Sequence, residues 1–477
     1  MRELLSLVWL ALTPLVWAVT YDAVIVGGGL SGLSAAKELT ARNKTWVVLE
    51  ARDRVGGRVW NKELPDGRPV EVGAEFIGPT QDHVIALSKE LGLSLYETPT
   101  DGDNIYYANN KAQRFPTLFG SLVPPVGLVD TLKLAELQGE IDDMAKKINP
   151  QSPWDTPEAS TWDAQSVKDW LKSKGSSQQV QDVIDTTVQE VFSTSTEKIS
   201  VLYMAVYVAA SGDAGHVGTF ERLTQTHPGA QQYRVTGGTY RLATGLLDKL
   251  GKPNVKLSSP VDSITKGDGS NATYTVTTRD GTSYEGQHVI VAMSPPMADK
   301  IKFTPSLPNQ RQQVQKLWKM GSLGKAIPQY ETAFWRDDHL NGQAISTSGY
   351  TRATFDSTPE NKGHGVMLCF VQDDMMRELD QVDEDTIKDK ITQDLVNYFG
   401  DKAKKPMGWV IQRWDLEEFS GGGPTSNPPL HAFAQYGEAL RKPVGNLHWA
   451  GTESSDYWIG YMDGALRAGQ RAASEIH

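Results

Sequence analysis

The sequence predicts an α/β protein made of two interleaved domains. Three observations predict this class: two strands enclose a glycine-rich turn and a helix in residues 21–50, helical apolar spacing runs through residues 162–208, and strand-like alternation runs through residues 255–292. The 477 residues suffice for two or three domains with a large core. No low-complexity linker or internal repeat divides the chain, so we expect the domains to be interleaved rather than consecutive.

The first predicted elements form a βαβ unit. Residues 21–26 (YDAVIV) are a short apolar run rich in β-branched side chains, as in a buried strand, and the glycine-rich residues 27–32 (GGGLSG) end it. The alanine- and leucine-rich residues 31–43 predict a helix, and residues 45–50 (TWVVLE) predict the next strand. This order of elements is typical of a parallel sheet.

Later segments predict a helical insertion followed by more sheet. Residues 162–208 place apolar side chains three and four positions apart, as amphipathic helices do. A further helix is predicted in residues 236–251, and residues 255–292 predict strands broken by polar turns. Residues 446–451 predict a last strand, and a final helix is predicted from about residue 460 to the end.

Composition and charge narrow the classes of partner. Hydrophobic residues make up 39% and charged residues 22%, which is typical of a folded globular protein. A net charge of −11 without a lysine or arginine tract argues against nucleic-acid binding through phosphate neutralisation. The nine histidines and the single cysteine lack the spacings of a metal site, so we expect neither nucleic acid nor a bound metal.

Residues 1–18 have the pattern of a secretory signal peptide, with one early arginine, an apolar run at residues 4–16 and a small residue at the expected cleavage point. The alternative is an uncleaved anchor, but this run is shorter than the ~20 residues that span a bilayer. Glycosylation triplets at Asn43 and Asn271 fit export. We therefore expect a secreted protein that has no membrane partner.

The glycine-rich turn predicts a binding site for a dinucleotide. It consists of Gly27, Gly28, Gly29, Leu30, Ser31 and Gly32. This G-x-G-x-x-G pattern lets backbone N–H groups and a helix N-terminus approach a pyrophosphate. Glu50 ends the second strand 18 residues after Gly32, where a carboxylate accepts hydrogen bonds from an adenosine ribose.

A second glycine pair follows Glu50. The segment LEARDRVGGR contains Ala51, Arg52, Gly57 and Arg58, and it concentrates backbone donors and arginines that suit a long phosphate-bearing ligand. The plain alternative is a basic turn without a ligand. This segment and the later VEVGAEFIGPTQ resemble the opening of the flavin-containing amine oxidase family, as it occurs in monoamine oxidases.

The resemblance covers almost the whole chain after residue 18. Further segments that carry it are RVTGGTYRLATGLLDKLG, NVKLSSPVDSI, MGSLGKAIPQY, RWDLEEFSGGGPT and HWAGTESSDYWIGYMDGALRAGQRAA. It implies a monoamine oxidase-like fold and FAD as the cofactor. The implied limits are residues 19–94, 236–313 and 417–477 for a Rossmann-like FAD-binding domain, and residues 95–235 and 314–416 for a helix-plus-sheet substrate domain.

The resemblance also implies cofactor contacts beyond the first turn. These are Gly57 and Arg58 by the flavin and its phosphates, Gly73, Ala74, Glu75 and Phe76 along the ring edge, Val261 near the adenine, and Trp414, Gly451, Thr452, Glu453, Tyr461 and Met462. The chemistry agrees, because a reduced flavin carries negative charge that a helix N-terminus stabilises, and a helix is predicted to begin at residues 460–462.

Lys325 has two interpretations. Its surroundings, residues 320–328, are apolar or small, and burying an unpaired lysine there would be costly, which predicts a solvated strand position. The resemblance implies instead a lysine that holds a water molecule at the flavin and assists its reoxidation by oxygen.

Substrate-side residues are implied by the same segments. Tyr461 matches one of two aromatic residues that flank the amine in monoamine oxidases, and Gln231 matches a substrate-side glutamine. Together with Lys325 and Trp414, Tyr461 is a predicted catalytic residue. The alternative for the aromatic residues is a place in the core.

Two positions depart from the mammalian monoamine oxidases. Gly423 stands where those enzymes have a cysteine that bonds the flavin, so we expect FAD to be held non-covalently. Pro424 stands where they have the second flanking aromatic residue, so we expect a wider substrate slot. The membrane-anchoring tail of that family is also missing, which fits the expectation of export.

The expected function is FAD-dependent oxidation of an amine to an imine, with molecular oxygen as acceptor and hydrogen peroxide as product. Hydrolysis of the imine would give an aldehyde or ketone. Two alternatives stay open: an oxidase that uses the imine for cyclisation, and a flavoprotein that binds FAD without turnover. An L-amino acid oxidase is disfavoured, because Ala74-Glu75-Phe76 lacks the arginine usual in that subfamily.

Overall fold

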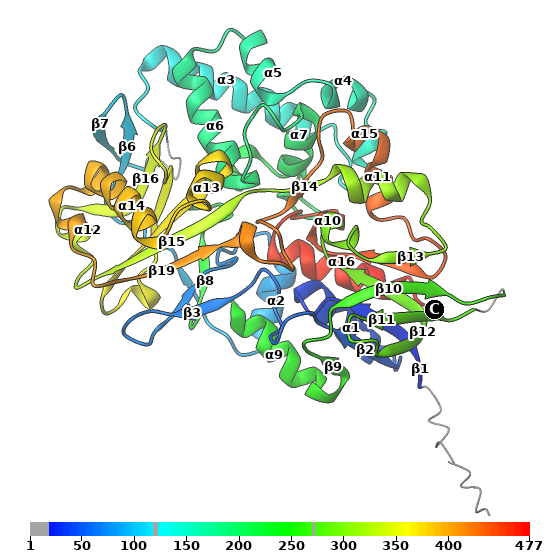
Figure 1. The fold of residues 1–477 in the computed structure, drawn as a ribbon. Coiled ribbons are helices and arrows are strands. Elements are labelled where there is room, and N and C mark those ends of the chain that lie inside the picture. Colours follow the sequence, from blue (N-terminus) through cyan, green and yellow to red (C-terminus); the bar gives the residue numbers. More distant parts are fainter. Residues whose placement is uncertain (1–18, 118–122, 270–271) are drawn as a thin grey trace, which may run out of the picture.

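The computed structural model describes residues 19–117, 123–269 and 272–477 (Figure 1). The predicted signal peptide, residues 1–18, and the glycosylation triplet at Asn271 lie outside these described residues. Asn43 lies inside them, on an exposed turn after the first helix. In the described ranges, no helix is both long and apolar enough to cross a membrane.

The first of two large sheets is built from both ends of the chain and a central segment. Its parallel part has the order β21 (Leu447–Ala450), β12 (Ser283–Ala292), β1 (Thr20–Val26), β2 (Trp46–Leu49) and β9 (Val255–Lys256). The first half of β12 also pairs antiparallel with β11 (Tyr274–Thr278), which leads to β10 (Val261–Lys266) and β13 (Lys302–Thr304).

Both faces of this sheet are covered. Ala23 and Ile25 of β1 pack in one apolar cluster with helices α1 (Leu30–Ala41), α2 (Asp82–Glu90), α9 (Tyr240–Leu250) and α16 (Met462–Ser474). Val24 and Val26 belong to a second cluster with residues of β10, β11 and β21. A strand enclosed on both sides needs a continuous apolar run, which is why the sequence of β1 does not alternate.

The second large sheet is mixed. Its order is β19 (Gly408–Arg413), β15 (Leu323–Tyr330), β18 (Gly365–Gln372), β17 (Ala353–Asp356), β16 (Leu340–Ser346), β6 (Asp103–Ala108) and β7 (Lys111–Phe115). Every pair is antiparallel except β16 with β6. Helix α14 (Glu384–Phe399) packs its apolar side chains against this sheet. All eight residues of β15 are buried, so this strand runs through the interior.

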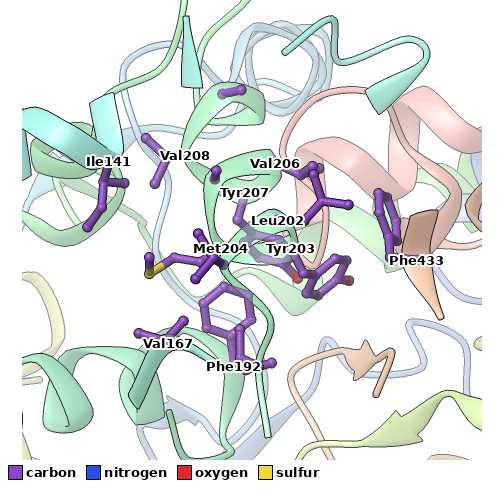
Figure 2. Close-up of a cluster of buried hydrophobic side chains, with 14 of the residues drawn as sticks. Ile141, Val167, Phe192, Leu202, Tyr203, Met204, Val206, Tyr207, Val208 and Phe433 are labelled. Atoms are coloured by element: carbon purple, nitrogen blue, oxygen red, sulfur yellow. The ribbon is translucent and has the colours of Figure 1, made fainter. Parts of the chain in front are cut away.

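A helical layer lies beside the second sheet (Figure 1). It contains α3 (Leu128–Ala145), α4 (Ala159–Asp163), α5 (Val167–Ser173), α6 (Gln178–Phe192), α7 (Val201–Ala210), α8 (Phe220–Thr224) and α15 (Phe433–Tyr436). Helix α7 is buried on all sides and forms the centre of the layer. Figure 2 shows Phe192, at the end of α6, close to Tyr203 and Tyr207 of α7, whose ring centroids lie 6.0 and 4.5 Å away.

Short elements connect these layers. The two-stranded pieces are β3 (Asn61–Glu63) with β4 (Pro69–Glu71), β5 (Leu95–Glu97) with β8 (Tyr233–Val235), and β14 (Lys319–Met320) with β20 (Ser426–Asn427). The remaining α-helices are α10 (Pro295–Ala298), α11 (Asn309–Leu317), α12 (Phe334–Asp337) and α13 (Asp373–Leu379).

The predicted α/β class is confirmed, and the predicted elements are present. The βαβ unit, the helical insertion, the strands of residues 255–292, the last strand and the final helix all occur within a few residues of their expected limits. The expected domain limits stay a prediction.

The close approach of α1 and α16 gives a test of this packing. A Cβ atom at Gly469 would lie 2.1 Å from the backbone oxygen of Ser31, whereas one at Gly139 in α3 would meet nothing within 4 Å. We expect Gly469→Ala to lower the free energy of unfolding by about 1–3 kcal/mol through overpacking. Gly139→Ala should raise it by up to about 1 kcal/mol, because alanine favours an exposed helix. Chemical denaturation measures the free energy of unfolding of each variant. Equal stabilities of the two variants would contradict the close packing of α1 against α16.

Candidate active site

A cavity of about 370 Å³ is lined by residues of both large sheets and of the helical layer. The predicted site residues that line it are Gly27, Gly29, Leu30, Ser31, Glu50, Ala51, Arg52, Gly57, Arg58, Gly73, Ala74, Glu75, Phe76, Gln231, Val261, Lys325, Trp414, Pro424, Gly451, Thr452, Tyr461 and Met462. The structure therefore brings together residues from the whole length of the chain. Gly28, Gly32 and Glu453 are the predicted residues that do not line the cavity.

The glycine-rich turn presents backbone at one end of the cavity. Gly27 has φ +108°, a conformation that favours glycine, and a Cβ at Gly32 would lie 1.9 Å from the oxygen of Gly27. Gly32 thus acts by letting α1 pack against the turn, which explains why it does not face the cavity. Gly29 precedes α1 without a side-chain cap, so the first N–H groups of this helix stay available to an anion.

Glu50 is held at the end of β2. Its Oε2 accepts a hydrogen bond from the N–H of Gly28 at 2.6 Å, and its Oε1 accepts one from the N–H of Arg52 at 2.9 Å. Burial raises the pKa of this carboxyl, and the two N–H donors oppose that effect. Each carboxylate oxygen has a further lone pair for a ligand hydroxyl.

Arg58 connects two walls of the cavity. Its Nη1 donates to Oε1 of Glu453 at 2.6 Å and to the backbone oxygen of Pro424 at 2.7 Å. Glu453 is buried behind Arg58 and also accepts a hydrogen bond from the N–H of Ser426 at 3.3 Å. Glu453 therefore positions the arginine from outside the cavity.

Lys325 is buried in β15, so its interpretation as a solvated strand residue is wrong. Its side chain is 3% exposed. The Nζ donates to the oxygens of Gly73 at 2.7 Å and Glu71 at 3.2 Å, and to Oε2 of Glu75 at 3.0 Å. Burial lowers the pKa of Lys325, whereas Glu75 opposes this by favouring the charged form. The partners that make burial possible come from a segment about 250 residues away in sequence.

Two charged residues that sequence reasoning missed extend this pair. Arg234 Nη2 donates to Oε2 of Glu71 at 2.6 Å and lies 3.6 Å from Oε2 of Glu75. We name the set of Lys325, Glu75, Arg234 and Glu71 the buried ion network. Two acidic residues four positions apart in the apolar stretch VEVGAEF were the available signal, but their partners are not visible in a local pattern.

The N-terminus of α16 opens at the cavity. Tyr461 precedes the helix without a side-chain cap, and the hydroxyl of Thr452 donates to the backbone oxygen of Tyr461 at 2.8 Å. The N–H of Gly451 donates to the hydroxyl of Ser31 at 2.9 Å, which joins this region to the glycine-rich turn. Free N–H groups at a helix start supply positive potential.

Aromatic side chains line the other end of the cavity. Phe76 contacts Phe355, with ring centroids 5.1 Å apart, and Phe355 contacts Phe370 at 6.0 Å. Trp414 is buried, and its Nε1 donates to the oxygen of Val72 at 2.8 Å. Sequence reasoning missed Phe355 and Phe370, as well as Glu190 and Tyr207, which also line the cavity. In the part of the chain that the structure describes, no cluster of three or more His, Cys, Asp or Glu side chains suits a metal ion.

Comparison with known proteins identifies the family. The family model described as flavin containing amine oxidoreductase matches residues 30–477. A putative flavin-containing monoamine oxidase, AofH, of Mycobacterium tuberculosis is 36% identical over 96% of each chain. Amine oxidase [flavin-containing] A of Bos taurus is 32% identical over 96% of this chain and 85% of its own length.

Solved structures agree with these relatives. Putrescine oxidase bound to putrescine superposes with a TM-score of 0.89 at 28% identity, covering 96% of this chain and 99% of its own. Cyclohexylamine oxidase from Brevibacterium oxydans gives a TM-score of 0.88 at 30% identity, again covering 96% and 99%. The predicted monoamine oxidase-like fold is thus confirmed.

The residues of the cavity fit FAD as the cofactor. Uncapped helix starts and arginines suit the phosphates, the carboxylate of Glu50 suits a ribose, and the aromatic end suits a flat apolar ring. FAD is the cofactor, and the protein is a flavin-dependent amine oxidase. The chain belongs to the flavin-containing amine oxidoreductase family.

Proposed function

We propose that this enzyme oxidises its amine to an imine with molecular oxygen as the electron acceptor. Hydrogen peroxide then forms, and hydrolysis of the imine gives an aldehyde or ketone. The observation that carries the proposal is the cavity itself, in which a buried lysine and a helix N-terminus adjoin an aromatic end. The sequence has no second G-x-G-x-x-G turn between a strand and a helix, which favours oxygen over a nicotinamide cofactor as acceptor.

The residues at the glycine-rich end would hold the dinucleotide. The first N–H groups of α1 face the position for phosphates, and Glu50 offers acceptors to a ribose. Arg58 is fixed by Glu453 and adds a positive charge to this region. Gly423 lacks a side chain that could bond the flavin, so we propose that FAD is held non-covalently.

The residues at the aromatic end would orient the amine. Bound FAD supplies the acceptor for the hydride equivalent from the α-carbon. Tyr461, Phe76 and Phe355 provide apolar surface that excludes water, and exclusion of water favours the neutral amine, which is the oxidisable form. Gln231 adds an amide group to the lining of the cavity.

Export remains part of the proposal. Residues 1–18 have the composition of a signal peptide, and the triplet at Asn43 lies on an exposed turn where a glycan would not meet the core.

Turnover is tested by adding amines to the purified enzyme without oxygen. We expect the flavin absorbance to bleach, and admitting air should restore it with release of peroxide. A screen of primary, secondary and aromatic amines, followed by product analysis, separates simple deamination from cyclisation of the imine. A flavin that no amine in the screen bleaches would contradict the proposal and favour a protein that binds FAD without turnover.

Lys325 gives a sharper test of the role of oxygen. Its three N–H donors already have three acceptors, so we expect it to act chiefly as a positive charge beside the flavin. Lys325→Met should slow reaction of the reduced enzyme with oxygen by ~10- to 100-fold, with FAD content unchanged. Stopped-flow absorbance measures the rate.

Two further variants control this test. The double variant Lys325→Met/Glu75→Gln avoids leaving a buried carboxylate unpaired, and Lys319→Met removes an exposed lysine from β14. The double variant should react slowly with oxygen after reduction, and the Lys319→Met variant should react at the wild-type rate. Wild-type reoxidation in the double variant would show that Lys325 serves only the fold.

Pro424 tests the width of the substrate slot. It lines the cavity where mammalian relatives are expected to carry an aromatic residue, so small aromatic amines should be held loosely. Misplacement by ~1 Å can cost on the order of 100-fold in rate. Pro424→Tyr should raise kcat/KM for benzylamine relative to a bulky, ring-constrained amine, whereas Tyr461→Ala should lower both. An unchanged preference in a Pro424→Tyr variant that folds and holds FAD would refute the role of Pro424.

A further inference from the structure

One end of the cavity is covered by a short segment, residues 417–421, which we name the clasp. Glu418, Phe419 and Ser420 of the clasp line the cavity. The side chain of Glu418 is also 59% exposed, and that of its partner Arg279, another lining residue, is 48% exposed. A side chain that borders both the cavity and the solvent separates the two. The clasp and Arg279 therefore form part of the outer wall of the cavity.

This outer wall lies at the end of the cavity that suits a ribose. The N–H of Ser259 donates to the backbone oxygen of Glu50 at 2.8 Å. The next residue, Pro260, accepts a hydrogen bond from the N–H of Arg279 at 2.8 Å, and both Ser259 and Pro260 line the cavity. Because Glu50 suits a ribose, the clasp covers the end proposed to hold the adenosine half of FAD.

Side chains from other segments hold the clasp in place. Arg279, in the turn between β11 and β12, donates from Nη1 to Oε1 of Glu418 at 2.6 Å. Lys300, which follows α10, donates to the backbone oxygen of Glu418 at 3.1 Å. Arg52 donates from Nη2 to the hydroxyl of Ser420 at 2.9 Å. Each polar contact near the surface contributes little free energy, so the closed position depends on several of them acting together.

Phe419 adds an aromatic contact with two of these cations. The guanidinium carbon of Arg52 lies 5.7 Å from the centroid of the Phe419 ring, and that of Arg279 lies 5.4 Å from it. Cation–π attraction at these distances holds the ring to both arginines. The two arginines come from segments more than 200 residues apart, so Phe419 ties the clasp to two separate parts of the wall.

A glycine gives the clasp a hinge at its C-terminal end. The N–H of Gly423 donates to the oxygen of Gly321 at 2.9 Å, and a Cβ at Gly422 would lie 2.2 Å from the same oxygen, so these two glycines are fixed. Gly421 has φ +64°, and among the described residues its Cβ would meet only Cε of Met297 within 4 Å. Glycine changes its backbone angles at little steric cost, so the clasp can turn at Gly421.

We propose that the clasp opens about Gly421 to admit and release FAD, and that Arg52, Arg279 and Lys300 keep it closed over the bound cofactor. The inference rests on the non-covalent attachment of FAD in the proposed function and adds a route for its exchange. A wall segment held by surface contacts opens at a smaller cost than a buried strand such as β15, which forms another wall of the cavity.

The rate at which the holoenzyme releases FAD tests the clasp. Excess phosphodiesterase cleaves the released FAD, and the fluorescence of the flavin product gives the rate. Glu418→Gln should speed release by about 2- to 5-fold, the value of an exposed ion pair. Phe419→Ala should speed it by roughly 5- to 30-fold through loss of two cation–π contacts. Glu438→Gln, which removes an exposed carboxylate paired with Lys442 outside the cavity, should release FAD at the wild-type rate.

Salt gives an independent readout of the same pair. Sodium chloride screens the attraction between Glu418 and Arg279, so it should speed FAD release from the wild type. The Glu418→Gln variant has no such pair to screen, so its rate should depend less on salt. Equal salt dependence in the two proteins would contradict the role of this pair in closing the clasp.

Hydrogen exchange in the holoenzyme measures the opening itself. Amides of residues 417–421 should exchange faster in Glu418→Gln and Phe419→Ala than in the wild type, whereas those of β1 should not change, which excludes a general loss of stability. Unchanged exchange of the clasp, or equal FAD release from Glu418→Gln and Glu438→Gln, would overturn the inference. Flavin that stays with the denatured protein would overturn only the non-covalent attachment, and exchange of the clasp would then decide the inference.

Discussion

The buried ion network is the constraint on which the cavity depends. Lys325, Glu75, Arg234 and Glu71 have side chains that are at most 5% exposed, and they carry two positive and two negative charges. Removing one partner of such a set leaves a buried charge uncompensated, which costs about 3–5 kcal/mol. The network joins β15, β8, β4 and the segment that follows β4, so it fixes the wall of the cavity that Lys325 and Glu75 line.

The cavity has two chemically different halves. One half consists of backbone N–H groups, a carboxylate and arginines, which suit the phosphates and ribose of a dinucleotide. The other consists of aromatic rings with few polar atoms, which suits an apolar reacting centre. Glu50 and Arg58 in the first half already have protein partners that hold them in place before a ligand arrives, so little ordering is left for binding to supply.

Local patterns predicted the first half well and the second half poorly. The glycine-rich turn, Glu50 and the start of α16 are encoded in contiguous motifs, each with its own strand or helix signal. The burial of Lys325 was wrongly predicted from its neighbours because its partner Glu75 lies 250 residues earlier. The roughly three helical turns of α6 before Glu190 give an amphipathic pattern in which a glutamate looks solvated, and only tertiary packing brings Glu190 to the cavity.

The link between Ser31 and Gly451 also bears on the order in which the molecule forms. These residues are 420 positions apart, and the last helix lies directly on the first. A ribosome delivers the start of a chain long before its end, and domains generally fold in that order during synthesis. Here Ser31 of the glycine-rich turn can bond to Gly451 only after residue 451 has been synthesised, so we expect this end of the cavity to form late. Contacts between residues so far apart in the sequence also slow folding, compared with a protein whose contacts are mostly local.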